Sequence, residues 1–189
     1  MKFIIIIATS IVGLFLIFMA AIAMIFARLP KEHAVTRSIL LNRPPSEVYT
    51  VVHDFASMPK WRSDVQQVEV TTQPDGRIHF RETGKHGIVN FELTEDVPEE
   101  RMVTRITDTD LGYSGSWTYV FTAEGNLTRV TITENGEVSN ILFRFFSRYV
   151  FGHTATIDGY LTSLAKHFGE TRTPPIDSPD CFHSPPKGL

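Results

Sequence analysis

The sequence predicts an α+β fold in which a curved antiparallel sheet wraps around one long C-terminal helix, with a single transmembrane helix before it. Three observations support this. Residues 3–27 are an uncharged apolar run, residues 35–134 hold short alternating segments separated by turns, and residues 140–168 form a long apolar pattern without proline. Closely spaced alternating segments are typical of antiparallel strands, and an apolar helix is the natural cover for one face of such a sheet.

The N-terminal run is long enough to cross a bilayer. Residues 3–27 contain no charged side chain over 25 positions. As a helix they would extend about 37 Å, whereas a bilayer core needs about 20 apolar residues. A cleaved signal peptide is the alternative, because Ala21-Ile22-Ala23 fits a small-x-small cleavage pattern, although the run is longer than a usual signal core. We expect a single-pass membrane protein.

The charges that flank this run favour one orientation slightly. Lys2 precedes the run, whereas Arg28, Lys31 and Arg37 follow it. Because cytoplasmic flanks carry the excess of Lys and Arg, the soluble domain is expected on the cytoplasmic side.

The chain divides into three expected regions. Residues 1–33 form the anchor and a linker, residues 34–169 the folded domain, and residues 170–189 a tail with five prolines that we expect to be disordered or extended. Cys181 is the single cysteine, so an intrachain disulfide is excluded. The net charge of −3 argues against a nucleic-acid partner.

The folded domain opens with a strand and a short helix. Residues 35–41 alternate as a strand. Pro44-Pro45-Ser46-Glu47 then favours a helix start, because proline suits the first turn and an acidic side chain suits the positive helix end. The apolar residues of 48–55 recur at helical spacing and predict one buried stripe. Met58-Pro59-Lys60-Trp61 ends this helix and begins a short second turn.

Six further strands are expected before the last helix. Turn signals separate them at Pro74-Asp75-Gly76, Lys85-His86-Gly87 and Glu124-Gly125-Asn126. Such short connections favour antiparallel hairpins. The predicted strands are 65–72, 77–83, 88–95, 101–107, 115–122 and 127–134.

The terminal helix is expected over residues 140–168, with Asn140 as N-cap and a kink or break at Gly152. A curved sheet around one helix leaves room for a cleft between them. Residues 143–151 are too apolar for a helix with one buried side. Part of this cluster is expected to be core, and the alternative for the remainder is an exposed patch that contacts a membrane or lines the cavity entrance.

The order of elements resembles a known superfamily. Pro44-Pro45-Ser46-Glu47-Val48-Tyr49, Met58-Pro59-Lys60-Trp61 and the stretch 128–133 before the last helix carry the resemblance. Over residues 34–169 the chain resembles the START-like SRPBCC superfamily, in particular its polyketide cyclase/dehydrase and lipid transport branch. The resemblance implies a helix-grip fold with a hydrophobic cavity.

Aromatic side chains are the best candidates for lining that cavity. Trp117, Tyr119 and Phe121 alternate onto one strand face, and Trp and Tyr combine apolar surface with a polar group. The alternative is that they form ordinary core beneath the helix. The full set of ligand-binding candidates is Phe80, Phe91, Trp117, Tyr119, Phe121, Tyr149 and His153.

The sequence lacks the usual signatures of catalysis and metal binding. The seven histidines show no metal-ligand spacing, and no GxSxG, Walker A or GxGxxG motif occurs. His53 and Asp54 are adjacent on a helix and therefore do not face each other. We expect no metal, no cofactor and no catalytic residue.

The leading hypothesis is a membrane-anchored domain that binds a lipid or another hydrophobic small molecule. One alternative is a polyketide cyclase or dehydratase, which needs an acid or base inside the cavity. Its candidate groups are His79, Arg81, Tyr119 and His153. The other alternative is a protein-interaction module without a ligand, whose partner the sequence does not identify.

Overall fold

The structure is a computed structural model that describes residues 13–15, 17–19, 30–85, 87–139, 154–170 and 174–177. Within these residues, no helix combines the length and apolarity needed to span a membrane. Most of the predicted span at 3–27 lies outside the described residues. Its described parts, 13–15 and 17–19, are helical. The transmembrane helix therefore stays a prediction.

The described elements follow the predicted order closely. They are β1 (Glu32–Leu41), α2 (Pro45–His53), the 3-10 helix η1 (Phe55–Lys60), β2 (Val65–Thr72), β3 (Ile78–Gly84), β4 (Gly87–Val97), β5 (Arg101–Ile106), β6 (Tyr113–Glu124), β7 (Leu127–Val138), α4 (Ala155–His167) and β8 (Ile176–Asp177).

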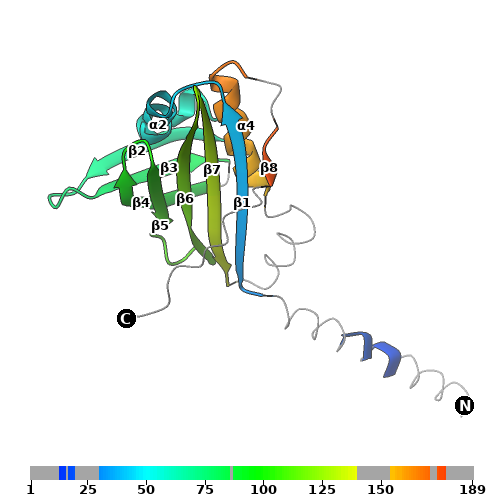
Figure 1. Cartoon of the computed structure of the whole chain (residues 1–189). Helices are drawn as coiled ribbons and strands as arrows, with labels where there is room; N and C mark the ends of the chain where they lie inside the picture. The colour runs from blue at the N-terminus through cyan, green and yellow to red at the C-terminus, as the bar shows by residue number, and fades with distance from the viewer. Residues whose placement is uncertain are drawn as a thin grey trace, which may run out of the picture.

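The strands form one eight-stranded sheet in the order β2-β3-β4-β5-β6-β7-β1-β8, and every neighbouring pair is antiparallel. Figure 1 shows α4 packed along one face near β7 and β1, with α2 at one end of the sheet. The connection that contains α2 and η1 carries the chain from β1, next to the β8 edge of the sheet, to β2 at the opposite edge. The described residues therefore have the predicted architecture of a curved sheet holding a C-terminal helix.

Local sequence explains the first helix and the first hairpin. Pro45 occupies the first turn of α2, and the side chains of Val48 and Val52 are fully buried one turn apart. Gly76 in the β2–β3 turn has φ +87°, a conformation that other residues rarely adopt. The residue types at these two places therefore favour the helix start and the turn that the structure shows.

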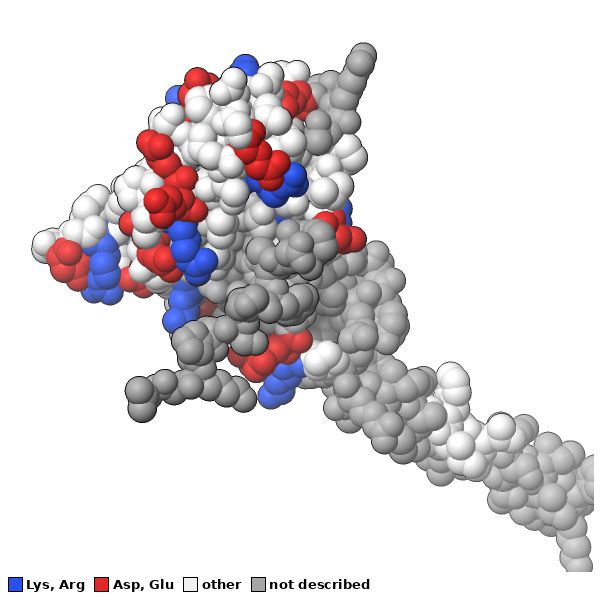
Figure 2. Space-filling view, viewed as in Figure 1, with Lys and Arg blue, Asp and Glu red and all other residues white. Residues whose placement is uncertain are grey.

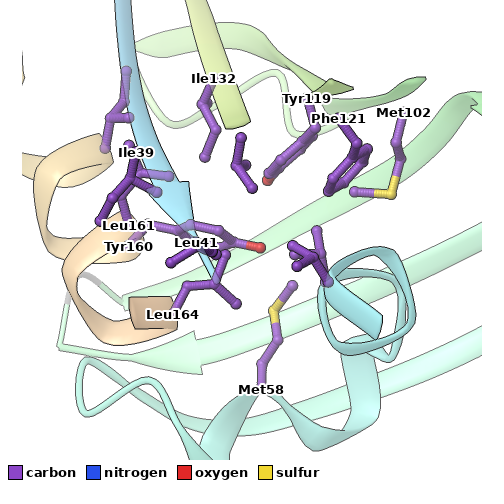
Figure 3. Packing of buried hydrophobic residues seen from close by; sticks show 14 of the residues in the cluster. Ile39, Leu41, Met58, Met102, Tyr119, Phe121, Ile132, Tyr160, Leu161 and Leu164 are labelled. Carbon is purple, nitrogen blue, oxygen red and sulfur yellow. The ribbon is translucent and has the colours of Figure 1, made fainter. Parts of the chain in front are cut away.

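One face of the sheet, here called the inner face, packs against α4. Alternation along each strand places Ile39, Tyr119 and Ile132 on this face. Figure 3 shows these side chains meeting Tyr160, Leu161 and Leu164 from α4. The end of the hollow near α2 is therefore filled by the hydrophobic core, which continues onto Val48, Val52, Phe55 and Met58.

Helix α4 is too short to cover the whole inner face. Its 13 residues extend about 20 Å, whereas the 12-residue strands β6 and β7 extend about 40 Å each. The predicted helix at 140–168 is confirmed over residues 155–167, and residues 140–153 lie outside the described residues. The part of the inner face far from α2 is thus not covered by α4.

Part of the proline-rich tail joins the sheet edge. β8 pairs with β1 at Ser38 and Arg37. The Arg37 side chain donates hydrogen bonds to Asp158 on α4 (2.6 Å), to Asp177 on β8 (2.5 Å) and to the carbonyl oxygen of Pro175 (2.8 Å). One arginine thus ties the helix and the tail to β1. Residues 176–177 are extended and paired, whereas the remainder of the tail beyond 177 lies outside the described residues.

Candidate functional site

The five described candidates, Phe80, Phe91, Trp117, Tyr119 and Phe121, all belong to the inner face. Phe80, Tyr119 and Phe121 are almost fully buried, whereas Phe91 and Trp117 are half-buried against the same core. Tyr149 and His153 lie outside the described residues. The alternation of side chains therefore places the strand aromatics on one face. Phe80, Tyr119 and Phe121 belong to the core, and the role of Phe91 and Trp117 as a cavity wall stays a prediction.

Three phenylalanines form a stack below α2. The Phe55 and Phe80 rings lie 4.1 Å apart, and the Phe80 and Phe91 rings lie 4.9 Å apart, in nearly parallel planes. Phe121 contacts the edge of Tyr49 at 5.7 Å. Because Phe55, Phe80 and Phe121 are at most 5% exposed, these contacts make them part of the packed core. Phe91, by contrast, is only half-buried at the margin of this core.

Tyr160 on α4 is the centre of a second aromatic cluster. Its ring lies 5.1 Å from Trp61, 5.6 Å from Trp117 and 5.8 Å from Tyr119, and the Arg62 guanidinium lies 5.2 Å from its centroid. Figure 3 shows the Tyr160 side chain projecting from α4 into the space between helix and sheet. These five residues, the Tyr160 cluster, join α4, the end of η1 and the middle of β6.

Two polar atoms in this cluster are buried without a hydrogen-bond partner among the described residues, the Tyr160 hydroxyl and the Trp61 indole nitrogen. Burial raises the pKa of Tyr160 well above its ordinary value, and the neighbouring Tyr119 acts in the same direction. The two hydroxyls influence each other, although they do not meet the geometry of a hydrogen bond. The Tyr160 hydroxyl is therefore protonated at neutral pH and retains a proton to donate. A buried polar group without a partner is rare and requires an explanation.

A buried ion pair adjoins the Tyr160 ring. Arg62, 8% exposed, donates to Glu82 at 2.9 Å and to Asp64 at 2.7 Å. Burial raises the pKa of Glu82, and Arg62 only partly offsets this effect. For Arg62, burial lowers the pKa, but Glu82 and Asp64 more than compensate. The hollow thus contains a fixed guanidinium beside a carboxylate that readily accepts a proton.

A second carboxylate lies on the uncovered part of the inner face. Glu134 accepts a hydrogen bond from the Trp117 indole at 2.9 Å, and its other oxygen lies 3.1 Å from Nε2 of His33. Gly136 makes room for this arrangement, because a Cβ there would collide with the His33 ring. Glu134 and His33 are about one-fifth exposed, so this polar group is reachable from solvent.

The sequence interpretation missed these charged residues, although alternation could have identified two of them. Glu82 follows Ile78 and Phe80 on the same strand face, and Glu134 follows Val130 and Ile132. A carboxylate in an otherwise apolar row is the signal. Their partners come from distant parts of the chain, and no spacing rule connects them.

The candidates for the enzyme alternative do not gather. His79 and Arg81 alternate with Phe80 and therefore lie on the opposite face of β3. Tyr119 lies on the inner face, where burial raises its pKa. His153 lies outside the described residues. In the part of the chain that the structure describes, no group of three or more His, Cys, Asp or Glu residues is placed to hold a metal ion.

A polar pocket of about 1150 Å³ lies at the other side of the sheet. Much of its wall is one cross-strand row on the outer face, formed by Glu92, Arg105, Ser116, Asn135 and Ala34. This pocket differs from the predicted apolar cavity in both position and polarity. Figure 2 shows the mixed positive and negative charges over the described surface in this view.

Comparison with protein families and solved structures agrees with this architecture. Residues 32–169 match the model of the family described as polyketide cyclase / dehydrase and lipid transport. Comparison with curated proteins gives no match.

Among solved structures, the chain is similar to a START superfamily protein from Mycobacterium smegmatis (13% identity, TM-score 0.61, 72% of this chain and 97% of that one). It is also similar to the Zhui aromatase/cyclase from Streptomyces sp. R1128 (13%, 0.61, 73% and 94%). A protein from Thermus thermophilus is a third example (21%, 0.60, 72% and 97%). At these identities the likeness concerns the fold, which is the START-like helix-grip fold.

Proposed function

Because the chain belongs to the polyketide cyclase / dehydrase and lipid transport family, we propose that it binds a lipid or another hydrophobic small molecule between the sheet and the terminal helix. The observation that carries this proposal is the row of aromatic side chains on the inner face, where Trp117 and Phe91 are only half-buried beside the packed core. Among the described helices, α4 extends along about half the length of β6 and β7.

The binding surface of the proposed site is the part of the inner face that lies beyond α4. Trp117 and Phe91 are half-buried there, as are Ile106 and Val89. Removing apolar ligand surface from water at such a wall contributes about 25 cal/mol per Å², before the entropic cost of association. His33 and Glu134 at the same end supply a polar rim. Tyr149 and His153 remain part of this proposal because they belong to the predicted terminal helix at 140–168.

Membrane attachment is the second part of the proposal. Residues 3–27 would hold the domain at a bilayer, where hydrophobic molecules concentrate, with the domain on the cytoplasmic side. Leu14, Phe15, Ile17 and Phe18 support this, because their side chains are 60–71% exposed on a helical segment. Exposed large apolar residues in a group are typical of a membrane or protein contact.

Cyclase or dehydratase chemistry is the second candidate function. The observation that favours it is Glu82, a buried carboxylate with a raised pKa beside Arg62 and near two tyrosines. Such a carboxyl group is suited to donating a proton inside an apolar site. Turnover of a polyketide-like substrate that is lost in Glu82→Gln, with binding retained, would favour this function over binding alone.

Native mass spectrometry of the full chain tests the binding function. The chain is purified in detergent and examined for retained apolar molecules, and then for binding of an added fluorescent fatty acid. Trp117→Ala is expected to weaken that binding severalfold. Val120→Ala is the matched control, because Val120 is an apolar residue of the same strand on the opposite face. Equal effects of the two substitutions would contradict the proposed location of the site.

A further inference from the structure

Strand β2 is an edge of the sheet with one free side. Among the described strands it has a single neighbour, β3. Residues 69–72 are all exposed, and Val70 is 42% exposed, although valine is among the residues that proteins most often bury. Figure 1 shows the turn between β2 and β3 extending away from the rest of the sheet. The backbone of such an edge is able to pair with another strand.

The register with β3 shows which backbone groups of β2 are free. The Gln73 amide donates to the carbonyl oxygen of Arg77, its opposite residue, at 2.8 Å. Hydrogen-bonded and non-hydrogen-bonded pairs alternate along an antiparallel ladder, so Thr71 and Glu69 also bond β3. The residues beside these direct their N–H and C=O groups away from β3, and they are Val68, Val70 and Thr72. Three donors and three acceptors therefore lie in a row along this edge.

The usual protection of an edge strand is missing over this row. Natural edge strands carry lysine, proline or a bulge that interrupts pairing. In β2 the bulge lies before the row, at residues 65–67, and Pro74 follows the row. Residues 67–73 contain no lysine, no proline and a single charge, on Glu69. The row is thus open to pairing over its whole length, and pairing stops at both ends.

The row is complementary to a second copy of itself. When two β2 strands pair antiparallel about a two-fold axis at Val70, every free N–H group of the row meets a free C=O group. The two Val70 side chains then lie opposite each other, and Glu69 lies opposite Thr71 of the second copy. An axis at Glu69 would oppose two glutamates, which is unfavourable. An axis at residue 68 would carry the pairing into the bulge, and one at residue 71 would carry it onto Pro74.

We propose that two copies of this chain associate through β2, antiparallel and with Val70 at the two-fold axis, so that their sheets join into one. The shared ladder uses the free backbone groups of both strands, and the contact between the two valines buries apolar surface that each copy exposes alone. This inference goes beyond the proposed binding function and does not depend on it, because β2 lies four strands away from β6 in the sheet order.

A disulfide experiment tests the register directly. Val70→Cys in a Cys181→Ser background leaves one thiol per chain. The proposed axis puts the two Cα atoms at position 70 about 5.5 Å apart, a distance that a disulfide spans. The full chain in a mild detergent is oxidised, and the dimer is followed by electrophoresis without reductant.

Thr72→Cys in the same background is the matched control. Thr72 is exposed on the same edge, but its two copies would lie about 14 Å apart, beyond the reach of a disulfide. We expect Val70→Cys to form the dimer about tenfold faster than Thr72→Cys or better.

Native mass spectrometry of the full chain at increasing concentration measures the reversible dimer. Val70→Lys places two like charges opposite each other and is expected to raise the dissociation constant about tenfold. Val97→Lys is the matched control, because Val97 on β4 is 40% exposed and lies outside the proposed contact, and it should leave the dissociation constant unchanged. Circular dichroism verifies that both variants are folded.

Three outcomes would overturn the inference. Equal rates of cross-linking for Val70→Cys and Thr72→Cys would contradict the axis at Val70. A wild-type chain that stays monomeric at every concentration would mean that a different partner, or none, pairs with β2. Equal weakening of the dimer by Val70→Lys and Val97→Lys would mean that the copies meet through another surface.

Discussion

The indole nitrogen of Trp117 lies 2.9 Å from a carboxylate oxygen of Glu134, its directly opposite neighbour in the β6–β7 pair. The bond fixes the large Trp117 side chain in one orientation on the inner face. His33 approaches the other oxygen at 3.1 Å. A carboxylate that contacts two rings holds both of them at the edge of the proposed site.

Glu134→Leu should therefore lower the stability of the folded protein. Loss of the bond from Trp117 to a charged acceptor is expected to lower the free energy of unfolding by about 1–2 kcal/mol. Urea denaturation followed by circular dichroism measures the change. Glu137→Leu, on the exposed opposite face of the same strand, serves as control and should change stability by less than about 0.5 kcal/mol. Similar losses for both would mean that the Trp117 bond contributes nothing measurable.

Removing the buried arginine should be more damaging. Arg62→Met leaves Glu82 without its partner in a buried position and is expected to cost about 3–5 kcal/mol. The double variant Arg62→Met, Glu82→Leu removes the stranded charge, so we expect it to be more stable than Arg62→Met alone. Thermal unfolding of the three proteins checks this order. A double variant that is less stable than the single one would refute the assignment of Glu82 as the main partner.

Stability should also depend on pH through Glu82. Because burial raises its pKa in the folded state, the folded protein holds this proton more tightly than the unfolded chain does. The resulting stabilisation is complete below the ordinary pKa of glutamate and is lost as the pH rises through the raised value. The melting temperature of the wild type relative to Glu82→Gln should thus decrease between about pH 4 and pH 7. A constant difference over this range would contradict the raised pKa.

The contacts of Arg37 make a separate prediction about the tail. Arg37→Gln loses the bonds to α4 and to β8 and should cost about 1–2 kcal/mol, because Arg37 itself is largely buried. Asp177→Asn removes only the contact with an aspartate that is 89% exposed, so its effect on unfolding should be small. Limited proteolysis near residue 177 should nevertheless become faster in both variants. Unchanged cleavage would show that Arg37 does not hold β8 in place.

Local sequence patterns predicted most of the elements. The strand at 65–72 was predicted with the bounds that the structure shows, and Pro45 begins α2 as its position indicated. β6 extends two residues beyond the prediction at each end, and β7 is longer because the polar stretch Asn135-Gly136-Glu137 continues it. Pairing with β1 on one side and β6 on the other stabilises this stretch, and single-strand alternation does not reveal such pairing.

The site was less predictable than the fold. Its aromatic residues follow from alternation, since Trp117, Tyr119 and Phe121 share one strand face. Its charged residues depend on tertiary contacts, because Arg62 meets Glu82 only after β2 and β3 pair. β8 could not be predicted either, since these two residues form a strand by pairing with β1 from far away in the sequence, where Arg37 also bonds Asp177 and Pro175.

The most direct test of the central claim is the content of the hollow. Full-length protein purified from cells in a mild detergent is analysed by native mass spectrometry, and the released small molecules are identified. The account predicts one apolar molecule per chain, displaced by an added fluorescent fatty acid and bound severalfold more weakly in Trp117→Ala. A chain that carries nothing and binds no apolar probe, with a hollow filled by its own side chains, would contradict it.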